Sequence, residues 1–240
     1  DVCSSDLGRG AVQITSYLDF WFASFLALGA QAALRTSSAF YLLPVSLFGM
    51  SVAAAELPDL ARLGSAAPEV WRDRLDRALR KMAFLNVPAT VGFLGLGGVI
   101  IGAVIQSGAF GPVETRLAAW VLAAAALGLL AATSSRLLIN AFYAQGDSRT
   151  PSRIALGRVI AWAVTAVPLM LFLDRLAPAP GTELRCGAVG LALAGALGSW
   201  VEFGLLVRAL RLGPVPGFQP PWRSWMRMVV AAGLALAVSA

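Results

Sequence analysis

The residues that could bind a ligand are a few charged and amide side chains inside otherwise apolar runs. Asp19 and Glu202 each lie within such a run, where a carboxylate could bind a cation, face a cavity or pair with a charge on another helix. Arg136 and Asn140 are one helical turn apart, and Arg158 lies one turn into the next run, so these three could form a basic cluster. Snorkelling of the two arginines toward lipid head groups is the alternative that needs no ligand. The pattern favours binding inside a membrane over catalysis.

Several kinds of chemistry are excluded by what the sequence lacks. It has no His, which excludes His-based catalytic triads and His metal sites. Its two cysteines, Cys3 and Cys186, are too few and too far apart to predict a disulfide framework or a thiolate metal cluster. No P-loop motif is present for nucleotide hydrolysis. We therefore expect no catalytic residue, no metal and no cofactor.

The elements that position these residues are predicted to be membrane-crossing helices. The chain of 240 residues is 58% hydrophobic and 13% charged, whereas an ordinary soluble domain is about a quarter charged. A bilayer core needs about 20 mostly apolar residues per helix. Such runs occur at 11–30, 36–57, 82–105, 117–142, 154–173, 187–207 and from 225 onward. We expect an all-α, polytopic transmembrane helix bundle of six complete helices and the beginning of a seventh, and a soluble enzyme is excluded.

The net charge of +6 could indicate a nucleic-acid partner, so the placement of the basic residues matters. Twelve of them lie in alternate connections between the spans: Arg62, Arg72, Arg74, Arg77, Arg80, Lys81, Arg149, Arg153, Arg208, Arg211, Arg223 and Arg227. The remaining connections hold four, namely Arg35, Arg116, Arg175 and Arg185. The positive-inside rule places the twelve in the cytoplasm and the four outside. The charge therefore indicates topology, and we expect no nucleic-acid partner.

Residues 69–81 are predicted to form a helix that does not cross the membrane. Apolar residues recur at helical spacing on one of its faces: Trp71, Leu75, Ala78 and Met82. Charged residues cover the other faces and include two i to i+4 pairs, Asp73 with Arg77 and Asp76 with Arg80. We expect an interfacial helix on the cytoplasmic leaflet, attracted to anionic lipids. A solvated connecting helix is the alternative.

The two ends of the chain predict a part of a larger transporter. Residues 1–10 are polar and resemble a linker or a non-native start more than a signal peptide. Residues 11–210 hold the six complete helices, and residues 211–240 form a cytoplasmic loop followed by a truncated further helix. Within the spans, Pro44 and Pro168 each remove a helical hydrogen bond and favour a kink. These kinks are either hinges or static bends.

A polar stretch, "INAFYAQGDSRTPSR" at 139–153, interrupts two apolar runs. Gly146 is placed to stop one helix, Thr150 can cap the next, and Pro151 suits its first turn. We therefore expect a tight cytoplasmic turn. The segment "AFYAQGDSRTP" in this turn also resembles the AFYAxxDxxTP signature of the MurJ/MviN lipid II flippase family. The matching residues are Phe142, Tyr143, Asp147, Thr150 and Pro151.

Other segments resemble the same family in the same order. They are "QITSYLDFWFASFL", "LLPVSLFGMSVAAAELPDLARL" and "NVPATVGFLGLGGVIIGAVIQSGAF", which look like the family's seventh, eighth and ninth helices. The resemblance covers about residues 11–210. It implies the multidrug/oligosaccharidyl-lipid/polysaccharide exporter fold, in which two six-helix lobes surround a cavity. This chain would be the second lobe and the start of the thirteenth helix, and its partner would be a first lobe of the same protein.

The resemblance also implies a function. Family members are held to move lipid II, an undecaprenyl-pyrophosphate-linked peptidoglycan precursor, across the bacterial inner membrane by alternating access. No bond is made or broken, and the driving force is thought to be the membrane potential or an ion gradient. The expected partners are the lipid-linked substrate and membrane lipids. The alternatives are a polysaccharide-lipid or drug exporter of the same fold, and a membrane scaffold that does not transport.

One departure from the family pattern concerns the eighth helix. Well-known members carry an "ADRLMEFP" type stretch whose Arg faces the cavity and suits a pyrophosphate. Aligning on Pro44 gives "SSAFYLLP", so Ser38, Ala39 and Leu42 occupy the three charged positions. Arg35 lies four residues before Ala39, about one turn, and could point to the same side. The hypothesis is that Arg35 replaces the missing cavity arginine. The alternative is that Arg35 marks the outer membrane interface.

Overall fold

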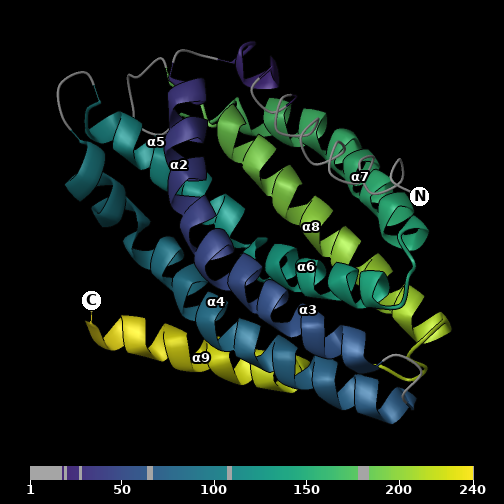
Figure 1. Cartoon of the computed structure of the whole chain (residues 1–240). Coiled ribbons are helices and arrows are strands. Elements are labelled where there is room, and N and C mark those ends of the chain that lie inside the picture. Colours follow the sequence, from purple (N-terminus) through teal and green to yellow (C-terminus); the bar gives the residue numbers. More distant parts are fainter. Residues whose placement is uncertain are drawn as a thin grey trace.

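The computed structural model describes residues 18, 21–26, 29–63, 67–106, 110–177 and 184–239. Within these residues the regular elements are all helical. They are α2 (Ala30–Pro44), η1 (Val45–Met50), α3 (Ser51–Leu63), α4 (Pro68–Ile105), α5 (Pro112–Ala126), α6 (Leu129–Ala144), α7 (Arg149–Leu173), α8 (Gly187–Leu212) and α9 (Trp222–Ser239) (Figure 1). The predicted helical bundle is confirmed. Most of the predicted first span, with Asp19, and the predicted linker at 1–10, with Cys3, lie outside the described residues.

The second predicted span is longer than its apolar run. Elements α2, η1 and α3 form one uninterrupted helix from Ala30 to Leu63, in place of the predicted 36–57. The helix begins after Gly29, whose φ of 90° is accessible to glycine at little cost. Directly after Pro44 the helix becomes π-helical at η1. A proline has no N–H to donate, and a short π-helical segment is one way in which a helix absorbs such an irregularity.

The predicted interfacial helix at 69–81 is wrong in one respect. Residues 69–81 are the first part of α4, a helix of 38 residues that continues into the predicted third span without a break. Trp71, Leu75, Ala78 and Met82 are each at most 3% exposed, because this face packs into the apolar core. An apolar face that is buried inside the protein is not available to a lipid surface. The segment is amphipathic, as predicted, but its apolar face contacts other helices and not lipid.

The predicted single span at 117–142 is two helices. Elements α5 and α6 meet at Leu127–Gly128 with a bend of 40°. A Cβ on Gly128 would lie 2.7 Å from the Cα of Ala196, so α8 approaches the break too closely for any side chain. The Trp200 indole N–H donates to the carbonyl of Leu127 at 2.9 Å, which pairs a polar backbone group at the break. Contacts with α8 thus stabilise the bend.

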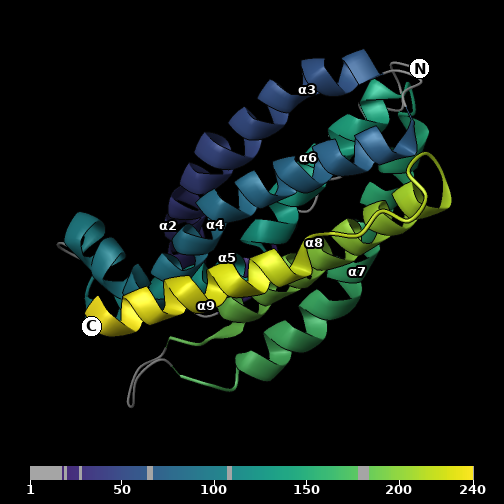
Figure 2. The ribbon, with the colours of Figure 1, turned by 90° about the horizontal axis from the view of Figure 1, so that it is seen from below.

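The remaining helices pack around this frame. Element α7 lies along α8, where a Cβ on Gly190 would lie 2.5 Å from the backbone of Leu169. Element α9 lies along α4 (Figure 2). Pro168 is inside α7 and exposed, and its role as a hinge stays a prediction.

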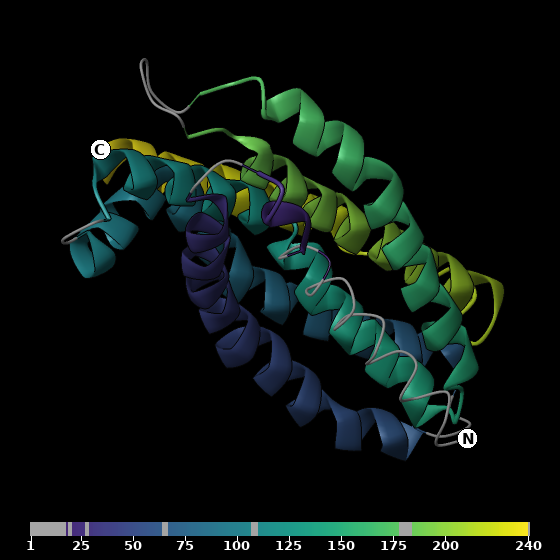
Figure 3. The same cartoon turned by 90° about the horizontal axis from the view of Figure 1, so that it is seen from above.

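The helix ends fall into two groups. The ends joined by the α3–α4, α6–α7 and α8–α9 connections lie on the right-hand side of Figure 1, and those joined by α4–α5 and α7–α8 lie toward its top and upper left. Figure 3 shows the same separation. By length and composition, four described helices can cross a membrane, or five if the bent α5–α6 pair counts as one span. The twelve basic residues of the sequence prediction lie in the helix segments that adjoin these three connections, so they share one end of the bundle, as the charge pattern predicts.

Candidate substrate-binding site

Arg35 and Ala39 lie on one exposed face of the α2–η1–α3 helix. Exposed residues recur along this face every three or four positions: Arg35, Ala39, Leu42, Ser46, Met50, Ala54 and Leu57. Since Arg35 and Ala39 are one turn apart on this face, an arginine at either position would project from the same side of the helix. The geometric condition for the Arg35 hypothesis is met. Whether that side faces a cavity stays a prediction.

Arg158 and Glu202 form an ion pair between α7 and α8. The Arg158 Nη1 atom lies 3.1 Å from Oε2 of Glu202, and the side chains are 22% and 5% exposed. Gly198 lies one turn before Glu202, and a Cβ there would be 3.5 Å from Cγ of Arg158. The stem of Arg158 thus lies against α8 beside Gly198. A buried carboxylate needs such a partner, so pairing with another helix is the option that the structure selects for Glu202.

The other two members of the predicted basic cluster have different surroundings. Arg136 on α6 is exposed. The close approach of Arg136 and Arg158 that the predicted cluster requires stays a prediction. Asn140, in contrast, donates from Nδ2 to the carbonyl of Ala53 at 2.9 Å. It ties α6 to α3, and its amide N–H is used inside the protein.

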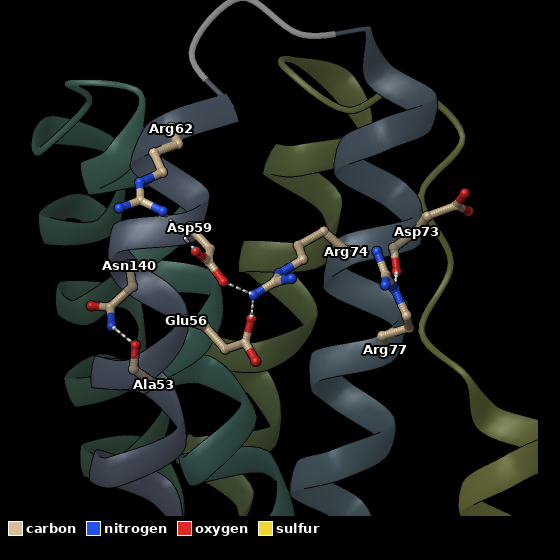
Figure 4. A network of polar contacts seen from close by, with 8 residues as sticks. All are labelled: Ala53, Glu56, Asp59, Arg62, Asp73, Arg74, Arg77 and Asn140. Atoms are coloured by element: carbon tan, nitrogen blue, oxygen red, sulfur yellow. Dashed lines mark hydrogen bonds and ion pairs between the residues drawn. The ribbon is translucent and has the colours of Figure 1, made fainter.

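A charge network between α3 and α4 was not predicted from the sequence. Arg74 on α4 is paired with Glu56 and Asp59 on α3, and Arg62 lies 3.9 Å from Asp59 (Figure 4). The distance from Arg74 Nη2 to Oε2 of Glu56 is 2.6 Å. We call Glu56, Asp59, Arg62 and Arg74 the Arg74 network. The i to i+3 spacing of Glu56 and Asp59 indicates that both carboxylates share a helix face. The spacing alone does not identify the basic residue that pairs with them.

The two predicted i to i+4 pairs on α4 have different outcomes. Arg80 and Asp76 form an ion pair at 2.6 Å, as predicted. Arg77 instead donates from Nε to the backbone carbonyl of Asp73 at 3.2 Å.

Among the described residues, no group of three or more Cys, Asp or Glu side chains could hold a metal ion.

Comparison with known proteins shows which family this chain resembles in sequence and in fold. The model of the family described as lipid II flippase MurJ matches residues 4–239. The chain belongs to the MurJ lipid II flippase family. It is 27% identical over 201 residues to a probable lipid II flippase MurJ of Rickettsia prowazekii, covering 83% of this chain and 37% of that protein. It is 34% identical over 176 residues to the protein so named from Rhizobium tropici, covering 72% of this chain and 30% of the relative.

The fold agrees with a solved member of the MurJ family. A structure described as lipid II flippase MurJ in an inward closed conformation superposes with a TM-score of 0.79 at 22% identity. The match covers 96% of this chain and 45% of that chain. The chain thus spans less than half the length of these MurJ relatives.

The turn that resembles the MurJ signature is built around Asp147. Helix α6 ends at Ala144, and Gly146 has a φ of 77°. The amide of Asp147 donates to Phe142 O and that of Gly146 to Tyr143 O, both at 3.0 Å, which is a Schellman motif. The Asp147 carboxylate accepts 3.0 Å hydrogen bonds from the amides of Arg149 and Thr150. Asp147 therefore caps α7, and the prediction that Thr150 does so is wrong.

The electrostatics of this turn follow from the same contacts. Partial burial raises the pKa of Asp147, but hydrogen bonds from the Thr150 side chain and the Thr150 and Arg149 amides, with the Arg149 charge, outweigh it. The net effect is a pKa below its ordinary value. Pro151 lies in the first turn of α7, as predicted. In this MurJ-family chain, the described signature residues thus serve a helix-to-helix turn.

Proposed function

We propose that this chain is the second lobe of a lipid II flippase of the bacterial inner membrane. The complete protein would move the undecaprenyl-pyrophosphate-linked precursor between the leaflets by alternating access, with a first lobe supplied by the rest of the protein. The observation that carries this proposal is the family match over residues 4–239. The helical arrangement supports it, since five membrane-crossing units are available when α5–α6 counts as one.

The residues proposed to contact the substrate are Arg35, Arg136 and Arg158, with Asn140 as a positioning residue. A diphosphate carries negative charge into a poorly hydrated cavity and needs cationic partners there. Arg35 and Arg136 are both exposed, so each side chain reaches the protein surface. Asn140 holds α6 against Ala53 of α3, and thereby keeps Arg136, one turn earlier, at a fixed position. Transport in this scheme makes and breaks no bond, so none of these residues is assigned a catalytic role.

The function is tested by complementation. The complete protein should restore growth and cell shape to a bacterium depleted of its own lipid II flippase. Purified protein should also move lipid II between the leaflets of liposomes. Export of a dye or drug without lipid II movement would favour the drug-exporter alternative. A correctly inserted protein that moves neither would favour a scaffold.

Arg35 gives the sharpest test of the site. Arg35→Ala should abolish complementation while insertion and expression stay at the wild-type level, because the diphosphate loses a cationic partner. Arg35→Lys should restore activity only in part, since an ammonium keeps the charge but not the two-pronged geometry. Because Ala39 lies one turn away on the same exposed face, Ala39→Arg in the Arg35→Ala background should recover activity. Full activity of Arg35→Ala would leave Arg35 as an interfacial anchor.

A further inference from the structure

The helix from Ala30 to Leu63 has an irregular segment at its middle. Pro44 offers no N–H for a helical hydrogen bond, and η1 (Val45–Met50) follows it at once. Isolated π-helical turns inside long helices are often found at functional positions. A Cβ on Gly49 would lie 2.6 Å from Cγ2 of Thr133, so η1 rests closely on α6. This segment divides the helix into an α2 half and an α3 half.

The two halves are attached to different parts of the bundle. In the α2 half, the Ser37 hydroxyl donates to the carbonyl of Ala118 in α5 at 2.7 Å. In the α3 half, the carbonyl of Ala53 accepts from Asn140 in α6. Further along α3, Glu56 and Asp59 pair with Arg74 of α4 (Figure 4). A movement of α3 about η1 would leave the α2 attachment in place and would have to break the contacts of α3.

The contact of Glu56 with Arg74 favours two distinct arrangements. The Glu56 side chain is 12% exposed, and within the described residues no aligned hydrogen-bond donor reaches its Oε2 atom. Arg74 therefore holds it chiefly by charge. A carboxylate this buried is tolerated with its cation beside it, and without that cation it must either take up a proton or move into water. Loss of the Arg74 contact therefore favours a displacement of α3 that hydrates Glu56 wherever Glu56 stays ionised.

We propose that Glu56, Asp59 and Arg74 form a latch at the arginine-rich end of the bundle. The latch holds α3 against α4 in the conformation described here, and it releases during transport so that α3 pivots about Pro44–Met50. This inference rests on the proposed function, because a protein that transports nothing has no need to release the latch.

Distances between α3 and α4 test the latch in the complete protein without its native cysteines. Spin labels at Ala61→Cys and Val70→Cys, both exposed, report the separation of the two helices at this end. Arg74→Gln should add a longer distance that the parent protein shows weakly or not at all, and Arg74→Lys should retain the parent distribution. The double variant Glu56→Gln with Asp59→Asn breaks the same contacts from the α3 side and should give the same longer distance. If one of the two variants fails to fold, the other still tests the latch.

The matched control is Arg77→Gln. Arg77 carries the same charge three residues further along α4, but its hydrogen bond is to the backbone of Asp73 in its own helix. It should leave the distances unchanged. An unchanged distribution in both latch-breaking variants, or an equal change in Arg77→Gln, would overturn the proposal.

A second measurement tests release during transport. Joining the cysteines at 61 and 70 with a short, reducible linker should stop lipid II movement in liposomes, and reduction should restore it. Transport at the parental rate in the linked protein would show that the latch does not open. If the unlinked parent moves no lipid II, the proposed function fails, while the distance measurements still decide whether the contacts of Arg74 hold α3.

Discussion

Asp147 shows how one side chain can decide where a helix begins. Its carboxylate accepts the amides of Arg149 and Thr150, two donors that have no partner inside α7. The sequence predicted the turn because Gly146 and Pro151 have strong backbone preferences. It predicted the wrong cap because Asp147 and Thr150 are both capping residues, and the observed backbone of the turn chooses between them.

The first prediction concerns this cap. Asp147→Ala should lower the stability of the protein by about 1 kcal/mol, the usual cost of losing a helix N-cap. Because the folded pKa of Asp147 is lowered, its contribution is fully present above the ordinary Asp pKa and is lost as the pH falls through the folded value. Thermal unfolding in detergent at neutral and at acidic pH measures both effects. Asp73→Asn should change neither, because Asp73 accepts the hydrogen bond from Arg77 with its backbone carbonyl, which the substitution keeps.

Individual site residues were predictable from the sequence, but their partners were not. Glu202 and Arg158 are charged residues inside apolar runs, a feature that can be recognised from the linear sequence alone. Their pairing depends on which faces of α7 and α8 meet, and small residues such as Gly190, which lies directly against the backbone of Leu169, determine those faces. Arg74 gave no such signal, because it lies in a segment where charges are frequent. Its significance comes from Glu56, which only the tertiary structure brings to it.

At the scale of elements, helix type and approximate position were more predictable than where a helix runs on or breaks. The run from 117 to 142 has no proline and reads as one helix, yet the chain bends at Leu127–Gly128. The cause is tertiary, since Ala196 fills the space beside Gly128 and Trp200 binds the carbonyl of Leu127. A single glycine in an apolar run is too weak a signal to predict such a break.

The bend leads to the second prediction. Gly128→Ala should destabilise the protein by roughly 1–3 kcal/mol, because the new Cβ would meet the backbone of α8 at Ala196. Gly195→Ala is the matched control in α8, where a Cβ would meet nothing within 4 Å. It should be neutral or slightly stabilising, since alanine favours a helix over glycine. Thermal unfolding of the two variants compares them, and an equal loss in both would rule out the close approach as the cause.

The continuous α4 helix leads to the third prediction. An interfacial helix and a buried helix have the same amphipathic pattern, so the pattern could not separate lipid from protein as the partner of Leu75. Because Leu75 is fully buried in the described structure, Leu75→Ala should cost roughly 2–5 kcal/mol of stability. Val70→Ala removes an exposed apolar side chain from the same helix and should cost much less. Equal effects on unfolding would favour the interfacial arrangement.

At the scale of the whole molecule, two apolar clusters occupy the two ends of the bundle. One cluster lies at the arginine-rich end and joins α3, α4, α6, α8 and α9. The other lies at the opposite end and joins α2, α5, α7 and the start of α8. The alternation of the connections was predictable from the sequence, because basic residues are concentrated in every second one. The lateral packing of the helices was not, because apolar residues face both lipid and protein in a membrane and lose their value as a core signal.

The last prediction concerns the orientation of the whole bundle. Twelve basic residues lie in the helix segments next to the connections that share one end, and four lie next to or in the other connections. Such an excess marks the cytoplasmic side. Ala61→Cys is at the arginine-rich end and Arg185→Cys is at the opposite end, and both positions are exposed. In the complete protein without its native cysteines, an impermeant maleimide added to intact spheroplasts should label position 185 at once. Position 61 should be labelled only after the membrane is made permeable. Labelling of both from the same side would contradict the topology. If position 61 is labelled at once and position 185 only after permeabilisation, the two ends still lie on opposite sides of the membrane, but the bundle has the opposite orientation. The Arg74 network would then lie on the outer side of the membrane.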